Sequence, residues 1–136
     1  MSFLLDTNVV SELRKRQPDP NVRTWLASVA GSDLFISVLV IGEIRQGIER
    51  LRPRDANRAA VYEAWLVVLR RDYRDRVLPI TSEISEQWGR FNAQRPISAV
   101  DGLMAATAGV HDLTLVTRNV ADVSGTGVRL LNPFGS

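Results

Sequence analysis

The sequence contains no cysteine and only one histidine, His111. Without cysteine there can be no disulfide bond, no thiolate nucleophile and no zinc site built on cysteine. The absence also favours a cytoplasmic protein, since small secreted domains often depend on disulfides. His111 lies in the turn 109–112 before an apolar segment, which predicts an exposed turn residue. Ser11 and Ser37 have no histidine near them in the sequence, so a hydrolase triad has little support.

Long hydrophobic runs are also missing. The N-terminal segment MSFLLDTNVVSELRKR places an acid directly after a short apolar stretch, so we expect neither a signal peptide nor a membrane span. The formal net charge of +2 does not by itself indicate nucleic-acid binding. The basic residues instead form local clusters, which are either solvated surface or patches that attract a polyanion. These clusters are Arg14, Lys15 and Arg16, and Arg45, Arg50, Arg52 and Arg54.

The chain has 136 residues, of which 45% are hydrophobic, as in an ordinary globular domain. It shows no repeat and no change of composition that would mark a linker, so we expect one domain over residues 1–136. Short apolar segments that predict strands alternate with segments of helical spacing. Such alternation implies an α/β fold, a three-layer α/β/α sandwich with a central parallel sheet of about five strands. The expected strands are 2–5, 34–36, 77–80, 113–116 and 128–131, and the expected helices are 9–13, 21–30, 37–51, 53–73, 82–91, 99–109 and 119–123.

Acidic and amide residues recur where such a fold would expose them at one edge. Asp6 directly follows the first expected strand, and Asn119 and Asp122 follow the strand 113–116. Because the carboxyl ends of parallel strands converge on one crevice, these side chains are expected to meet there. Asp101 in the first turn of its helix, and Glu43 about two turns into another, reach the crevice if their helices begin at the same edge.

Each of these residues also has an ordinary structural interpretation. Asp6 suits a helix N-cap and Asp101 suits a first-turn acid, while Asn119 and Asp122 suit exposed turns. Glu43 is different, because it lies among apolar residues where an unpaired carboxylate would be costly. Together, several carboxylates stay ionised only around a cation, and hard divalent ions prefer oxygen ligands. This set therefore favours hydrolysis of a phosphodiester by metal-activated water.

Four segments carry a resemblance to a known family. LLDTNVVSE, ISVLVIGEIRQGI, ISAVDGLMAATA and LTLVTRN followed by AD resemble the PIN-domain toxins, in particular the VapC-type branch with its FitB-like members. The resemblance covers essentially the whole chain, and the segments follow the family's order. It implies a PIN-like fold, a single PIN domain over residues 1–136.

The resemblance also implies site residues. Asp6, Glu43 and Asp101 match three of the family's metal-site acids. Many relatives carry an aspartate where this chain has Asn119, so either the Asn119 amide oxygen or the nearby Asp122 carboxylate fills the fourth position, and the sequence leaves this open. Asn8 and Thr117 are expected to support the acids. Among the basic residues, Arg118, Arg14 and Lys15 are expected to contact substrate, although Arg118 equally suits pairing with a partner's acid or tethering a site carboxylate.

The implied function is that of a Mg²⁺- or Mn²⁺-dependent endoribonuclease, the toxin of a type II toxin–antitoxin system. Its implied partners are an RNA substrate, a cognate VapB/FitA-like antitoxin that also binds operator DNA, and a second copy in a homodimer. We expect the antitoxin at the helical pair 37–51 and 53–73, and a cytoplasmic location. Two alternatives remain: an RNA-processing nuclease that is not a toxin, and a catalytically weak or inactive PIN-like scaffold that binds RNA or protein.

Overall fold

Five short strands form one parallel sheet in the computed structural model, which describes residues 1–135; Ser136, the last residue of the predicted domain, lies outside the described residues. The strands are β1 (Phe3–Leu5), β2 (Leu34–Ser37), β3 (Val77–Leu78), β4 (Thr114–Val116) and β5 (Leu130–Leu131). Their order is β3-β2-β1-β4-β5, and every neighbouring pair is parallel. This confirms the central parallel sheet predicted from the sequence.

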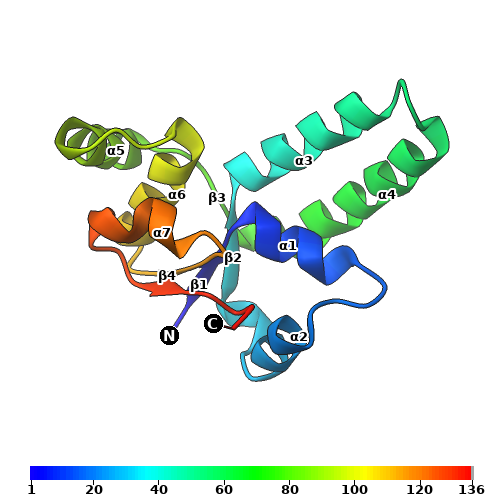
Figure 1. Ribbon diagram of the computed structural model, residues 1–136, viewed down its shortest axis with the longest axis horizontal. Coiled ribbons are helices and arrows are strands. Elements are labelled where there is room, and N and C mark those ends of the chain that lie inside the picture. The colour runs from blue at the N-terminus through cyan, green and yellow to red at the C-terminus, as the bar shows by residue number, and fades with distance from the viewer. Residues whose placement is uncertain (136) are drawn as a thin grey trace.

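Helices cover both faces of this sheet, as Figure 1 shows. They are α1 (Thr7–Arg14), α2 (Pro20–Ala27), α3 (Val38–Leu51), α4 (Ala56–Asp72), α5 (Ser82–Gln94), α6 (Ala99–Val110) and α7 (Val120–Val123). Parallel crossovers are right-handed. The chain runs from β1 outward to β3 and then returns to β4 and β5, so α1 to α4 lie on one face and α5 to α7 on the other. The predicted three-layer α/β/α sandwich is confirmed.

The strand order reverses between β1 and β4. Leu5 at the end of β1 pairs with Val116 at the end of β4, and the Asp6 amide donates a hydrogen bond to the Val116 carbonyl at 2.9 Å. In open α/β sheets the crevice at such a reversal, beyond the carboxyl ends of the strands, is where ligands bind. The residues that follow β1 and β4 therefore occupy the position at which chemistry is expected.

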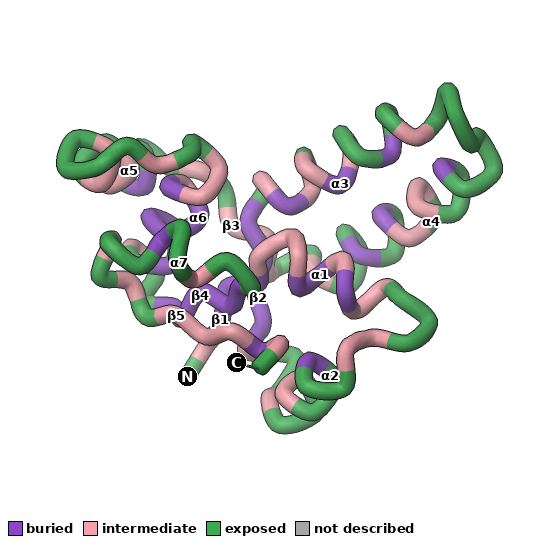
Figure 2. Tube along the Cα trace, viewed as in Figure 1, coloured by how far each residue is buried: buried purple, intermediate pink, exposed green. Residues whose placement is uncertain are grey.

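The core lies along the central strands. Leu4, Leu5, Ile36, Leu115 and Val116 are almost completely buried. Every residue of β1 and β4 is buried, as required of parallel strands that are covered on both faces. Figure 2 shows buried positions in the central strands and on the helices that pack against them, while the turn that joins α3 to α4, far from the sheet, is exposed. The central strands thus form a rigid base for the residues at their carboxyl ends.

Local capping explains where the helices begin and end. Ser37 and Ser98 cap α3 and α6 through their hydroxyl oxygens, as the sequence predicts. The helix expected from residue 53 begins only at Ala56, because the Asp55 side chain takes the N-cap position. The helix expected to stop at Gly31 ends earlier, with Ser28 as its C-cap. Within residues 1–135 no helix has both the length and the apolar character needed to cross a membrane.

Candidate active site

Asp6 stands at the strand-order reversal and is held by its neighbours on both sides. It caps α1, and its Oδ1 accepts a hydrogen bond from the Thr7 amide at 2.7 Å. Its Oδ2 accepts hydrogen bonds from Thr117 Oγ1 at 2.7 Å and from Asn8 Nδ2 at 3.3 Å. The structure therefore brings Asn8 and Thr117, the two supporting residues predicted from the sequence, into contact with the Asp6 carboxylate.

The segment after β4 is tied to α1 by the same polar residues. Thr117 is buried, and its hydroxyl oxygen accepts a hydrogen bond from the Asn119 amide at 3.1 Å. Asn8 Oδ1 accepts a hydrogen bond from the Arg118 amide at 3.2 Å. Because these residues satisfy one another's donors and acceptors, the Asp6 carboxylate has a fixed orientation.

Asp101 lies in the first turn of α6, where Ser98 Oγ donates a hydrogen bond to Asp101 Oδ2 at 2.8 Å. The next residue, Gly102, fixes how closely α5 approaches: a Cβ atom there would lie 2.5 Å from Trp88 Cδ1. Burial raises the pKa of the Asp6 carboxyl, and the charge of Asp101 raises it further, despite hydrogen bonds that act in the opposite direction. The two carboxylates are thus close enough to repel each other.

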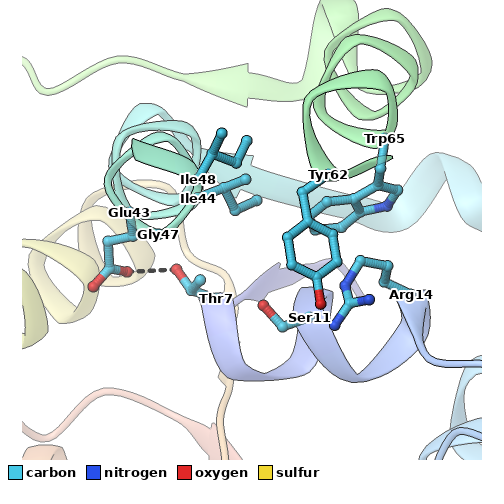
Figure 3. A pocket seen from close by; sticks show the side chains of 9 residues that line it. All are labelled: Thr7, Ser11, Arg14, Glu43, Ile44, Gly47, Ile48, Tyr62 and Trp65. Atoms are coloured by element: carbon cyan, nitrogen blue, oxygen red, sulfur yellow. Dashed lines mark hydrogen bonds between the residues drawn. The ribbon is translucent and has the colours of Figure 1, made fainter. Parts of the chain in front are cut away.

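Glu43 reaches the same region from α3. Its half-buried side chain accepts a hydrogen bond from Thr7 Oγ1 at 2.5 Å, drawn in Figure 3. Thr7 therefore contacts both acids, Asp6 through its amide and Glu43 through its hydroxyl. Sequence reasoning treated Thr7 only as part of a helix start. The available signal was its place between Asp6 and Asn8, but the helix expected over residues 9–13 begins two residues earlier, at Thr7.

Two predicted site residues have side chains that no hydrogen bond holds in place. Asn119 and Asp122 are exposed, and in the described part of the chain neither side chain forms a hydrogen bond. Asn119 precedes α7 as its N-cap residue without a side-chain capping bond, and Asp122 lies within α7. The structure thus brings Asp6, Asn8, Thr117, Asp101 and Glu43 toward one edge, but records no contact that selects between Asn119 and Asp122 as a further ligand.

The chemistry of these donors fits a hard divalent cation. Among residues 1–135 no three acidic or histidine side chains are grouped closely enough to enclose a metal. Magnesium, however, is usually held by one or two carboxylates and keeps several water ligands. The half-buried Asp6 carboxylate, whose pKa is raised by burial and by the charge of Asp101, is stabilised in its ionised form by a nearby cation. Asp6 and Asp101 are therefore the primary candidates, with Glu43 adjacent through Thr7.

The predicted substrate-binding cations lie on two sides of α1. The Arg14 guanidinium lies over the Tyr62 ring, 4.3 Å from its centroid, and faces α4. Lys15 instead pairs with Glu12 at 2.9 Å, and Arg118 lies 3.8 Å from the centroid of the Phe134 ring. Lys15 and Arg118 therefore lie on the same side of α1, where they line one pocket, and Arg14 lies on another side.

A groove opens between α1, α3 and α4, as Figure 3 shows. Glu43 and Thr7 lie at one end and Arg14 lies toward the other. The walls between them are largely apolar, and Gly47 leaves open space where a side chain would otherwise project. The lining residues are Thr7, Ser11, Arg14, Glu43, Ile44, Gly47, Ile48, Tyr62 and Trp65.

Comparison with known proteins gives concordant matches. The sequence model of the PIN domain matches residues 3–121. The toxin FitB of Neisseria gonorrhoeae is 29% identical over 97% of this chain and 98% of the relative. The VapC ribonuclease Y4jK of Sinorhizobium fredii is 29% identical, over 97% of each chain. Among solved structures, that of FitAB bound to the IR36 DNA fragment matches with a TM-score of 0.87 and 28% identity, covering 98% of this chain and 96% of that one.

Proposed function

The chain belongs to the PIN-domain family, and we propose that it is a metal-dependent endoribonuclease, the toxin of a type II toxin–antitoxin system. The observation that carries the proposal is the pair Asp6 and Asp101 at the strand-order reversal, where burial and mutual repulsion favour a cation. Relatives that match along nearly the whole chain are named as a toxin and as a ribonuclease, which supports the same function.

We propose Mg²⁺ or Mn²⁺ as the ion, which when bound polarises a phosphate and lowers the pKa of a water ligand. Asp6 and Asp101 supply the negative charge that holds it. Thr117 and Asn8 keep the Asp6 carboxylate oriented, and Ser98 does the same for Asp101. Glu43, fixed by Thr7, is the carboxylate placed to orient a water. Asn119 and Asp122 remain predictions for a further ligand position.

This division of roles needs no side-chain nucleophile. Water attacks the phosphorus of an RNA phosphodiester, and a carboxylate accepts a proton from that water. The bond from phosphorus to the leaving ribose oxygen breaks, and this oxygen takes up a proton and departs as a hydroxyl group. His111 takes no part, because it is exposed at the C-terminal end of α6, before β4 begins. We propose that the enzyme acts in the cytoplasm, where its RNA substrate is found, and that residues 1–136 form one PIN domain.

We further propose that a cognate VapB/FitA-like antitoxin occupies the groove between α1, α3 and α4, and that operator DNA is bound only through this antitoxin. The groove lies at the two helices expected from the sequence to receive it, and its apolar walls suit a protein segment. It ends at Glu43, so an occupant reaches the proposed active site. The homodimer expected from the sequence resemblance remains part of this proposal.

The function is tested by inducing the chain in bacterial cells that lack the antitoxin. We expect growth arrest together with new 5′ ends in cellular RNA, and neither effect with Asp6→Asn. The control Asp75→Asn, which removes an exposed acid from the turn Arg74–Arg76, should remain toxic. If the wild-type protein accumulates in folded form without cutting RNA, the binding scaffold replaces the nuclease. If it cuts RNA without arresting growth, the chain is an RNA-processing enzyme and not a toxin.

A further inference from the structure

Helix α1 presents two polar stripes that lead away from Asp6 on different sides. Thr7, Ser11 and Arg14 line the groove shared with α3 and α4. Residues spaced by four and three lie on one side of a helix, so Asn8, Glu12 and Lys15 form the neighbouring stripe. Glu12 and Lys15 line a second pocket, which lies between α1, the start of α2 and the segment after β4. Asp6 caps the helix at the point where both stripes begin.

Two acids line this second pocket, and one of them, Glu12, is paired with a lysine. Glu12 is only 6% exposed, and its carboxylate accepts hydrogen bonds from Lys15 Nζ and from the Asp19 amide, both at 2.9 Å. These contacts lower the pKa of Glu12, and the charge of Arg118 contributes. Asp19 itself caps α2 by accepting a hydrogen bond from the Asn21 amide at 2.8 Å. Lys15 offsets the charge of Glu12, whereas Asp19 keeps its negative charge, so the three cations that line the pocket outnumber its two acids.

Two other cations in the same pocket have no acidic partner. Arg23 and Arg118 line it, and within residues 1–135 neither forms an ion pair. The Arg118 guanidinium is stacked on the Phe134 ring at 3.8 Å, and the Phe134 carbonyl accepts a hydrogen bond from Asn21 Nδ2 at 3.1 Å. The C-terminal segment thus holds Arg118 in position against α2. A guanidinium that is fixed in advance loses less freedom when it binds an oxyanion.

The second pocket is also directly connected to the acidic site. The Arg118 amide binds Asn8 Oδ1 at 3.2 Å, and Asn8 Nδ2 binds Asp6 Oδ2 at 3.3 Å. One side chain therefore separates the pocket from the carboxylate that is proposed to hold the metal. A polyanion that extends from a phosphate at Asp6 along this side of α1 reaches Arg23 and Arg118, which form no ion pair within residues 1–135.

We propose that the pocket formed by Lys15, Arg23 and Arg118 binds a backbone phosphate of the RNA substrate, adjacent to the phosphodiester that is cut. This rests on the proposed ribonuclease function. The chemistry favours RNA over a protein segment here, because the cations lie together beside the acidic site, whereas the apolar walls that suit a protein line the other groove. Phe134 is the positioning residue, since it acts on the substrate only through Arg118.

Binding of a fluorescent single-stranded RNA oligonucleotide, measured by anisotropy in EDTA so that no metal supports cleavage, tests this subsite. Arg23→Gln and Arg118→Gln should each weaken binding about 10-fold. Each should also reduce the dependence of log Kd on log salt by about 0.7, the value for one contact to a single-stranded phosphate. The matched control Arg74→Gln removes an exposed cation that does not line the pocket and should leave both quantities unchanged.

Phe134→Leu, which keeps every charge, distinguishes binding by a preorganised Arg118 from general electrostatic attraction. It should weaken binding about 3-fold with an unchanged salt slope, since the contact is kept and only its preorganisation is lost. Equal weakening by Arg23→Gln, Arg118→Gln and Arg74→Gln would overturn the subsite in favour of net charge, and no weakening by Arg23→Gln or Arg118→Gln would overturn it outright. If the wild-type protein binds RNA through these residues but does not cleave it with Mn²⁺, the ribonuclease function fails and the binding pocket stands.

Discussion

At the scale of single residues, Thr7 connects two acids that come from different elements. Its amide donates to Asp6 Oδ1 and its hydroxyl donates to Glu43 Oε1. The amide contact is local to the start of α1, but the hydroxyl contact reaches across to α3. Thr7 therefore sets the position of the Glu43 carboxylate relative to Asp6, and its hydroxyl is required for that purpose alone.

We predict that Thr7→Val lowers the rate of RNA cleavage about 10-fold, the effect of losing one hydrogen bond to a charged group. Valine keeps the branched shape, so the thermal unfolding temperature should change little. Thr7→Ser restores the hydroxyl and should recover most of the rate. Cleavage rates at several Mn²⁺ concentrations are the measurement. Equal rates for the valine and serine variants would show that the hydroxyl does not position Glu43.

Sequence reasoning reached the Asp6 and Thr117 positions but not the contacts that join the acids. Both follow parallel strands, and the topology places such residues at one edge whatever the details of packing. The Thr7 contact with Glu43 depends instead on how α3 crosses α1, which no local pattern encodes. The same holds for the contact of Arg14 with the Tyr62 ring, which joins α1 to α4; that Arg14 contacts substrate stays a prediction.

At the scale of the elements, the close approach of α5 to α6 positions Asp101. Gly102 follows that acid, and a Cβ atom at Gly102 would lie 2.5 Å from Trp88 Cδ1 and 3.0 Å from Ile97 Cγ2. The absence of a side chain lets Trp88 pack directly against the first turn of α6. A substitution there must displace α5 or the turn that carries Asp101.

Gly102→Ala should therefore destabilise the protein by about 1–3 kcal/mol, the usual cost of overpacking, and should also slow RNA cleavage by displacing Asp101. The matched control is Gly89→Ala on α5, where the added methyl group meets open space. That change should stabilise the protein by about 0.5–1 kcal/mol, as expected when alanine replaces glycine in a helix. Urea denaturation compares the two. A Gly102→Ala variant as stable as the wild type would contradict the packing argument.

Helices α3 and α4 are joined by ion pairs on their exposed side. Arg45 Nη1 donates to Glu63 Oε1 at 2.7 Å, and Arg52 donates to both Glu63 and Glu49. The hydrogen bond from Arg45 is the main cause that lowers the pKa of Glu63 to about 2. The folded state therefore favours the charged form of Glu63 more strongly than the unfolded chain does.

The sign of the pH dependence follows from this lowered pKa. Between the ordinary glutamate value of 4.5 and about 2, the unfolded chain binds more protons at Glu63 than the folded protein, so stability falls as the pH falls through this range. Glu63→Gln should make the fall of stability with falling pH shallower. The control Glu83→Gln, which replaces an exposed acid on α5, should keep the wild-type dependence on pH. Unfolding temperatures between pH 2.5 and 5 measure it. An unchanged slope in Glu63→Gln would show that the ion pairs add nothing.

The helices and strands, and their order along the chain, could be predicted from the sequence. Short apolar segments and capping serines gave the sheet and most helix starts, because those signals are local. The start of α4 was misplaced, since Pro53 and Asp55 are both plausible beginnings and only the structure shows that Asp55 caps the helix. Which helical faces meet, and so where the grooves lie, depends on packing between distant segments.

At the scale of the whole molecule, Asp6 lies between two openings of different character. The groove between α1, α3 and α4 has largely apolar walls, and the pocket near Phe134 is lined by more cations than acids. An antitoxin in the first and RNA in the second would meet at the acids. Inhibition is then competition at Asp6 and Glu43, with most of the antitoxin's binding surface on a face that RNA does not use.

Gly47→Leu tests this separation, because it fills the apolar groove and removes neither an acid nor a cation. A Cβ atom at Gly47 meets open space, so the fold should tolerate the change. We predict that the purified variant cleaves RNA at the wild-type rate but binds the cognate antitoxin at least about 10-fold more weakly. Gly89→Leu, at an equally open position on α5, should affect neither. Unchanged antitoxin affinity in Gly47→Leu would place the partner elsewhere.

The central claim is that Asp6 and Asp101 form a metal-dependent nuclease site, and the most direct test is the rate at which purified protein cleaves a labelled RNA. We predict cleavage with Mg²⁺ or Mn²⁺, none in EDTA, and a loss of at least about 100-fold in Asp6→Asn and in Asp101→Asn, with the folded state intact by circular dichroism. Cleavage that persists in EDTA, or at the wild-type rate in both variants, would contradict the account.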